Sequence, residues 1–234
     1  FNFVFQATSL LTQAFNNSTD FNNPLDNWDV SNASGFTQTF RNATSFNQDI
    51  SGWDTGNSGA FNGMFIGASS FNQNISSWNV ANATTFSQTF RNATSFNQPI
   101  GAWTTTSLTN LYETFSGATA FDQNLANWDV SGVTTATSML TNSGISAANW
   151  DALLIGWAAQ GTGAGSLQAN VTLSNINQFH GSVDTAATAA YNKLTASPYN
   201  WTIVDLGDAN RLLLDNYTGA AAAYSLRKLR TAYT

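Results

Sequence analysis

Charged residues and cysteine are scarce in this chain of 234 residues. Charged side chains make up 9% of it, where a soluble domain usually has about a quarter. No cysteine is present, which excludes disulfides and thiolate metal sites. The net charge of −6, with only seven Lys and Arg, argues against a general nucleic-acid surface. Asn, Thr, Ser and Gly fill the polar positions, a composition typical of secreted and virion proteins.

Long apolar runs are also missing. No run reaches the roughly 18 residues that a membrane-spanning helix needs. The chain begins at Phe1 without a signal-peptide pattern and ends at Thr234 just after a basic stretch. We therefore expect it to be a segment of a longer polypeptide.

What the chain does contain is a repeat with a constant period of 25 residues. The aligned segments read FNNPLDNWDV, FNQDISGWDT, FNQNISSWNV, FNQPIGAWTT and FDQNLANWDV, and they begin at Phe21, Phe46, Phe71, Phe96 and Phe121. A fixed period of this size is typical of a solenoid, in which stacking supplies the core that one unit cannot build alone. The fold class that we predict is an α/β solenoid of about five to six stacked repeats, similar in plan to a leucine-rich repeat.

Each unit is predicted to contain a short strand around its tryptophan. In the third unit, Ile75 lies three residues before Trp78 and Val80 lies two residues after it. Apolar residues at such positions favour a strand, and stacking at about 4.8 Å per unit would join the strands in a parallel sheet. The tryptophans of this column are Trp28, Trp53, Trp78, Trp103 and Trp128.

A second part of each unit is predicted to be one or two turns of helix. Thr84 is a suitable N-cap, and Phe86 and Phe90 are spaced i, i+4 on one face. Two turns on, one column holds only asparagine and glycine: Asn17, Asn42, Gly67, Asn92, Gly117 and Asn142. These two residue types tolerate the left-handed conformation at a helix C′ position. We predict a positive φ throughout this column and a helix end there.

A polar column follows, consisting of Asn22, Asn47, Asn72, Asn97 and Asp122. Stacked in register, these side chains are expected to form a structural ladder of amide-to-amide hydrogen bonds.

Beyond the repeats, a different pattern predicts a small α+β cap over 146–207. The apolar spacing from Trp150 to Ala158 is typical of an amphipathic helix that covers the last repeat. A strand at 171–173, a helix starting near Asp184 and a strand at 201–204 would follow. The domain boundaries are thus predicted as a repeat solenoid at 1–145, the cap at 146–207, and a linker with the start of a truncated further module at 208–234.

Units such as FNQDISGWDTGNSGAFNGMFIGASS resemble the BspA-like, leucine-rich-repeat-related repeats of bacterial surface proteins, often described as a mycoplasma-lipoprotein domain of unknown function. The resemblance covers about residues 1–145, with Phe36, Phe40 and Phe86 where methionine is common. SAANWDALLIGWAAQ and NWTIVDLG are similar to the segment that closes such arrays in marine bacterial and phage-associated members. The resemblance implies surface exposure and adhesion or host interaction, and no catalytic residues.

Candidate catalytic groups are few. His180 is the only histidine and Glu113 the only glutamate. Glycoside hydrolysis by paired carboxylates would have to use Asp29, Asp54 and Asp129, one per unit. Asn79 and Thr104 occupy the same column, which favours a solvent-facing strand position. We predict no catalytic and no cofactor-binding residues, and a protein that is not an enzyme.

Calcium was weighed as a ligand of two carboxylate pairs, Asp49 with Asp54 and Asp26 with Asp29. No EF-hand or nonapeptide loop accompanies either pair, so no metal site is predicted. The sequons at Asn42 and Asn92 are expected by chance in a chain so rich in Asn and Thr.

Three functions from different classes remain open. The first is a non-catalytic structural or adhesion module of a larger surface polypeptide, at an extracellular, cell-surface or virion location. The second is a domain of a phage tail fibre or virion appendage, and the third a polysaccharide-acting β-solenoid enzyme. Expected partners are protein or glycan surfaces, or further copies through the parent polypeptide, with no nucleic acid and no membrane span.

Overall fold

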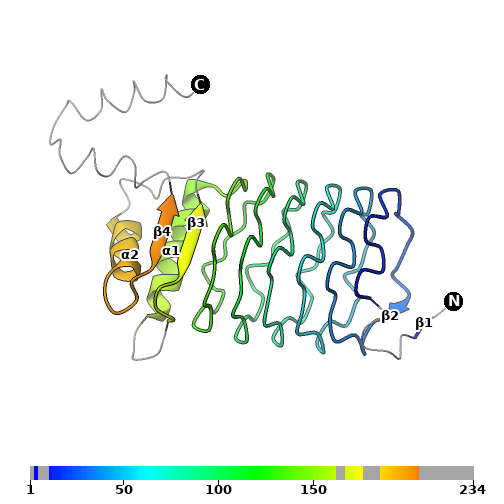
Figure 1. Cartoon of the computed structure of the whole chain (residues 1–234), viewed down its shortest axis with the longest axis horizontal. Helices are drawn as coiled ribbons and strands as arrows, with labels where there is room; N and C mark the ends of the chain where they lie inside the picture. The colour runs from blue at the N-terminus through cyan, green and yellow to red at the C-terminus, as the bar shows by residue number, and fades with distance from the viewer. Residues whose placement is uncertain (1–2, 5–10, 162–166, 176–184, 206–234) are drawn as a thin grey trace, which may run out of the picture.

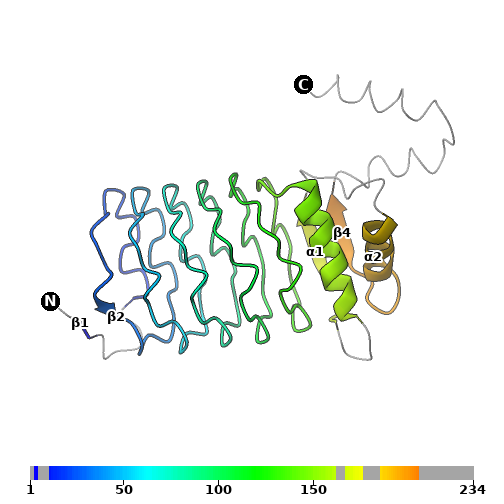
Figure 2. The ribbon, with the colours of Figure 1, turned by 180° about the vertical axis from the view of Figure 1, so that it is seen from behind.

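The structure is a computed structural model that describes residues 3–4, 11–161, 167–175 and 185–205. Residues 11–145 run as successive coils that lie side by side along the long axis of the molecule (Figures 1 and 2). We call this part the coil stack. At its N-terminal end, the two-residue strands β1 (Phe3–Val4) and β2 (Trp28–Asp29) pair in parallel.

Four elements lie beyond the other end of the coil stack, and we call them the cap. They are helix α1 (Ala147–Gln160), strand β3 (Thr172–Asn175), helix α2 (Thr185–Thr195) and strand β4 (Thr202–Asp205). Strands β3 and β4 form a parallel two-stranded sheet, with Leu173 beside Ile203. Each cap element overlaps or adjoins the segment predicted for it, whereas residues 206–234, with the predicted linker and further module, lie outside the described residues.

Backbone hydrogen bonds join each coil to the next. Between Phe36 and Asn42, every second N–H donates to the carbonyl oxygen 24 residues further on, as Phe40 does to Met64 at 2.8 Å. In between, the N–H groups of Thr39 and Arg41 donate three residues back, to Phe36 at 3.3 Å and to Gln38 at 3.2 Å. The pattern recurs in the following coils. These bonds pair most of the N–H groups of the segment without a helix.

The predicted short helices are therefore wrong, since the coil stack contains no helix. The reason lies in two left-handed positions four residues apart, which an α-helix of L-residues cannot accommodate. The predicted column is confirmed as left-handed, with φ of 62° at Asn17, 55° at Asn42, 66° at Gly67, 56° at Asn92, 74° at Gly117 and 57° at Asn142. A second left-handed column was not predicted, and it consists of Gln13, Gln38, Gly63, Gln88, Glu113 and Ser138.

The predicted strand forms around Trp28, in β2, which pairs with β1. The prediction is wrong for the later coils, because Trp53, Trp78, Trp103 and Trp128 lie outside the strands. The backbone N–H of Trp78 donates to the Ile75 carbonyl at 3.1 Å. Its indole N–H makes the bond between coils instead, to the Ile50 carbonyl at 3.0 Å. Trp53, Trp103 and Trp128 make the same bond. Isolated parallel bridges link Gly35, Ala60, Thr85, Asn110 and Thr135.

Aromatic columns fill the interior of the coil stack. Trp53 and Trp78 stack with ring centroids 6.5 Å apart, and Phe40 and Phe65 stack at 5.6 Å. Within one coil, Phe40 also stacks on Phe46 at 3.9 Å. All of these side chains are buried, as predicted. Such pairs add about 0.5–1.5 kcal/mol beyond the burial of their area, so the columns bind each coil to both neighbours.

The asparagine column beginning at Asn22 is bonded in another way than predicted. The side-chain oxygen of Asn47 accepts the backbone N–H of Asn72 at 2.9 Å and the Nε2 of Gln73 at 3.0 Å. The expected bond from one asparagine amide to the next is thus wrong here, because the Asn47 oxygen accepts from the backbone N–H of Asn72 and from the Gln73 amide. A direct amide-to-amide bond occurs in the left-handed column, from Asn42 Nδ2 to Asn17 Oδ1 at 2.8 Å.

Helix α1 takes the place of one wall of a further coil. Ser146 is its N-cap and accepts the N–H of Asn149 at 3.3 Å. The predicted apolar face, including Trp150 and Trp157, is buried. The indole N–H of Trp157 donates to the Leu125 carbonyl at 3.0 Å, which reproduces the bond that the tryptophans of the stack make.

Strand β3 continues the opposite wall. Ala136 donates its N–H to the Thr172 carbonyl, and Leu140 donates to that of Ser174, both at 3.2 Å. These are the alternate N–H groups that join one coil to the next elsewhere in the stack. The cap therefore ends the array by supplying the partners that another coil would supply.

Candidate functional surface

The carboxylates of the aspartates considered for catalysis accept hydrogen bonds from backbone N–H groups two residues further along the chain. Asp54 Oδ1 accepts the N–H of Gly56 at 3.1 Å, and Asp129 Oδ1 accepts that of Ser131 at 2.9 Å. Hydrogen bonds from Ser31 lower the pKa of Asp29 in the same way. Asn79 makes the equivalent turn without a charge, to Ala81 at 3.2 Å. These four side chains thus stabilise a turn in their coils, and the asparagine amide makes the same hydrogen bond as the aspartate carboxylates.

The two carboxylate pairs weighed for calcium are not brought into a larger cluster. Asp49 Oδ1 accepts the N–H of Ser51 at 2.9 Å, and hydrogen bonds from Ser51 lower the pKa of Asp49. Within the residues that the structure describes, no group of three or more His, Asp or Glu is placed to hold a metal ion. His180 lies outside the described residues.

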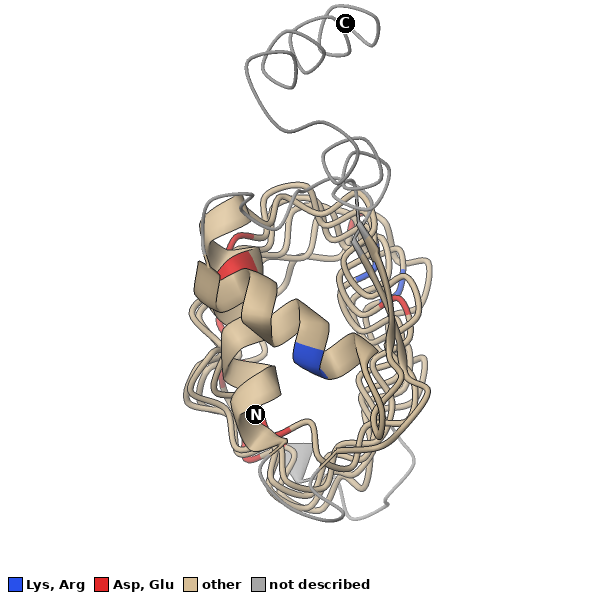
Figure 3. Cartoon of the chain, turned by 90° about the vertical axis from the view of Figure 1, so that its left-hand side faces the viewer, with Lys and Arg blue, Asp and Glu red and all other residues tan. Residues whose placement is uncertain are grey.

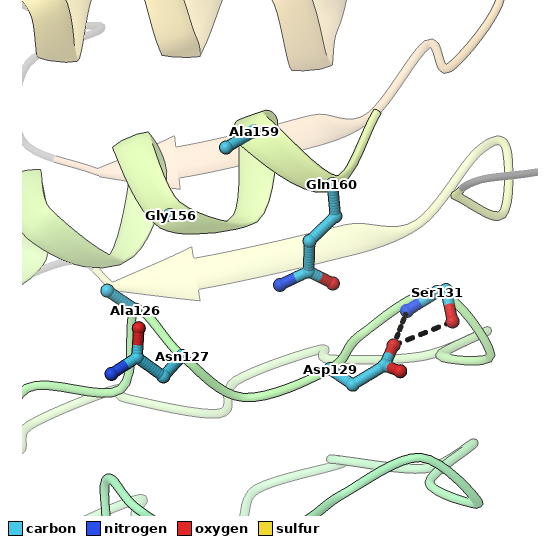
Figure 4. Close-up of a pocket in the computed structure, with 7 residues that line it drawn as sticks. All are labelled: Ala126, Asn127, Asp129, Ser131, Gly156, Ala159 and Gln160. Atoms are coloured by element: carbon cyan, nitrogen blue, oxygen red, sulfur yellow. Dashed lines mark hydrogen bonds between the residues drawn. The ribbon is translucent and has the colours of Figure 1, made fainter. Parts of the chain in front are cut away.

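A shallow groove of about 710 Å³ lies where α1 meets the last coil. Its lining comprises Ala126, Asn127, Asp129, Ser131, Gly156, Ala159 and Gln160 (Figure 4). The Gln160 amide bridges the two parts, since Nε2 donates to the Trp128 carbonyl at 2.7 Å and Oε1 accepts the N–H of Val130 at 2.9 Å. Among these lining residues, Ser131 Oγ donates to Asp129 Oδ1 at 2.6 Å, and the same oxygen accepts the N–H of Ser131, so the pair holds a turn.

A second feature interrupts the regularity of the coil surface, and we call it the Tyr112 patch: Gln88, Arg91, Tyr112 and Glu113. Glu113 lies at its centre, in an ion pair with Arg91 at 3.3 Å and accepting Nε2 of Gln88 at 2.8 Å. The Tyr112 hydroxyl donates to Glu113 Oε1 at 3.2 Å. That hydrogen bond and the negative charge of Glu113 raise the pKa of Tyr112.

The sequence analysis noted Glu113 as the only glutamate but overlooked Tyr112. The available signal was the column itself, in which Thr37, Asn62, Ser87 and Thr137 are all small and polar. A single aromatic residue in such a column indicates a surface position that departs from the repeat.

Over most of the described surface the charge is low. In the view along the stack, acidic and basic residues are few among the uncharged ones (Figure 3). Among the described residues, no helix has the length and apolar character required to cross a membrane.

Together these features define a repeat protein of stacked 25-residue coils, closed at one end by a cap that mimics a coil. The chain belongs to the family described as Mycoplasma protein of unknown function, DUF285, whose sequence profile matches residues 3–95 and again 53–153. No curated protein and no solved structure shows a significant match.

Proposed function

We propose that this chain is a non-catalytic, surface-exposed structural or adhesion module of a larger polypeptide. In this proposal it is a solenoid of the BspA-like, leucine-rich-repeat-related type that its motifs resemble. It acts at an extracellular, cell-surface or virion location and presents its repeated face to host, glycan or protein surfaces.

The observation that carries the proposal is the hydrogen bonding of polar side chains from coil to coil. Thr109 Oγ1 donates to the Thr84 carbonyl at 2.9 Å, and Thr134 Oγ1 donates to the Thr109 carbonyl at 3.2 Å. Asn42 and Gln73 also donate to the preceding coil, and Gln88 donates to Glu113 of the following one. Such pairing favours a stiff rod with a neutral face of hydroxyl and amide groups. Identical groups repeated along a line suit weak contacts at many points.

The arrangement of carboxylates supports a role without catalysis. Glycoside hydrolysis needs two carboxyl groups that face each other across the scissile bond. Asp29, Asp54 and Asp129 instead follow one another along a column and bond to their own turns. Glu113 is held in an ion pair with Arg91.

The proposal is tested with the purified chain in three assays: binding to a glycan array, adhesion to cultured cells, and turnover of polysaccharide and ester substrates. We expect binding or adhesion without turnover. Turnover that is abolished by D29N, D54N or D129N would overturn the non-catalytic assignment, because asparagine preserves the turn, as Asn79 does. Failure to bind any glycan, protein or cell would overturn the adhesive role.

A further inference from the structure

Tyr112 is the only exposed large hydrophobic residue of the coil stack. The residue is 37% exposed, and the other two such residues in the described structure, Ile155 and Val204, belong to the cap. The backbone beneath it is firmly held, since the Tyr112 carbonyl accepts the N–H of Gln88 and its own N–H donates to Asn110 Oδ1 at 2.9 Å. The stack thus presents one aromatic ring to solvent on a rigid support.

The polar members of the Tyr112 patch hold that ring and each other in place. The Glu113 carboxylate contacts Gln88 and Arg91 of the preceding coil and the hydroxyl of Tyr112 in its own coil. The Arg91 side chain is 41% exposed, and an ion pair so open to water contributes little to stability. We therefore interpret the contacts among these side chains as holding them in position at the surface, since they contribute little to the stability of the fold.

The net charge of the patch and its single exposed aromatic ring favour one class of ligand. The charges of Arg91 and Glu113 cancel, and the neighbouring positions of the column, Ser87 and Thr137, are uncharged. A protein partner typically requires a cluster of large apolar anchors, and the coil stack exposes only Tyr112. A sugar ring has a face of C–H groups that packs on an aromatic ring, and hydroxyls that bond to planar amide, guanidinium and carboxylate groups.

We propose that Gln88, Arg91, Tyr112 and Glu113 form a contact site for a neutral glycan, with one sugar ring packed on Tyr112. Arg91 and Gln88 donate to its hydroxyls, and Glu113 accepts from them. This inference rests on the proposed adhesive function and names the ligand class and the residues for one site on the surface.

The repeats supply substitutions that the fold already accepts. Ser87 occupies the column of Tyr112 one coil earlier, so Y112S removes the ring and keeps a residue type found at that backbone position. Gln88 occupies the column of Glu113, with φ 59° against 50°, so E113Q keeps a residue type that tolerates the left-handed conformation. T137S, in the same column as Tyr112 one coil later, is the matched control.

The experiment measures binding of the full chain and the three variants to an array of neutral oligosaccharides, including β-linked glucose, α-linked glucose and N-acetylglucosamine oligomers. Titration by calorimetry follows for those that bind. We expect Y112S to weaken binding at least about tenfold, as loss of an aromatic anchor usually does. E113Q should weaken it less, and T137S should not change it. Thermal melts should be the same for all four proteins, because Tyr112 is exposed.

Equal binding by Y112S and the wild type would overturn this site while leaving the adhesive function intact. Adhesion to cells that persists after enzymatic removal of their glycans would indicate a protein partner and would also overturn it. A wild-type chain that binds neither cells nor glycans would instead overturn the proposed function itself. The two proposals therefore fail by different results.

Discussion

The coil stack and the cap pair their backbone groups in different ways. In the stack, the N–H of Phe40 is satisfied by Met64 in the next coil, whereas α1 pairs most of its N–H groups internally. A coil consequently depends on its neighbours, while the cap needs only one surface to dock against. The junction between them works because Trp157 and β3 reproduce the bonds of a coil. The stability of the stack is collective, and its end must match its repeat.

The largest expected effect comes from breaking the interior of the stack. Trp78 is 4% exposed, stacks on Trp53 and bonds to Ile50. W78A should lower the free energy of unfolding by about 3–5 kcal/mol, measured by chemical denaturation. W28A is the control at the end of the stack, where the side chain is only half-buried, and it should cost less. A loss below about 1 kcal/mol for W78A would contradict the collective core.

The left-handed column gives the next largest effect. Asn92 has φ 56°, and a β-branched residue there is strained. N92V should destabilise the chain by about 1–3 kcal/mol. N92G is the control and should be close to neutral, because Gly67 and Gly117 occupy the same column at positive φ. If both variants unfold at the same denaturant concentration, backbone strain is not what selects asparagine and glycine.

Gly156 tests how closely the cap docks. In an exposed helix, replacing glycine by alanine stabilises by about 1 kcal/mol. Here an added Cβ would meet the carbonyl oxygen of Ala126 and approach its Cβ to 2.6 Å. G156A should therefore destabilise the chain, by about 1–2 kcal/mol, because α1 would have to move from the last coil. A rise in melting temperature would show that α1 does not touch the stack at this point.

The smallest effect concerns the charge at the junction. Asp122 closes the asparagine column, and its Oδ1 accepts from Ser146 N, Ser146 Oγ and Asn149 Nδ2 at 2.8, 2.7 and 2.7 Å. Burial opposes ionisation of this carboxyl, but the bonds from Ser146 and Asn149 outweigh it and lower the pKa of Asp122. D122N should cost about 1 kcal/mol at neutral pH, since bonds to a charged group are stronger than bonds to an amide.

That cost should depend on pH. A carboxyl with a lowered pKa in the folded state stabilises the fold above its unfolded value, here 3.8, and loses this contribution as pH falls through the folded value. The stability difference between the wild type and D122N should hence be largest at neutral pH and shrink below about pH 3.8. Melts of both proteins across that interval test this, and a difference independent of pH would contradict a role for the charge.

Several structural features followed from the sequence because they depend on one residue type at a time. The left-handed column was predictable, since only asparagine and glycine occur from Asn17 to Asn142. The second left-handed column was not, because Gln38 and Glu113 show no such preference. The i, i+4 spacing of Phe86 and Phe90 predicted a helix wrongly, because both side chains face the core in a non-helical coil.

The candidate site was less accessible to sequence reasoning than the fold. Asp29 and its column were predicted to be solvent-facing strand positions, and the structure shows that the carboxylates of Asp29 and Asp54 each accept a backbone N–H two residues on. The Tyr112 patch joins residues from two coils, Arg91 and Glu113 being 22 positions apart. A local pattern cannot show such a contact, although the 25-residue register brings Gln88 and Glu113 to the same column.

By itself the sequence determined the 25-residue period, the buried aromatic columns and the site of the cap helix, because hydrophobic spacing and residue type report burial and backbone preference locally. Only the tertiary structure decided where the backbone N–H groups donate. A neighbouring coil offers carbonyl oxygens at hydrogen-bonding distance, and that partner, absent from any single unit, makes left-handed turns with bonds between coils more favourable than the helix that one unit alone suggests.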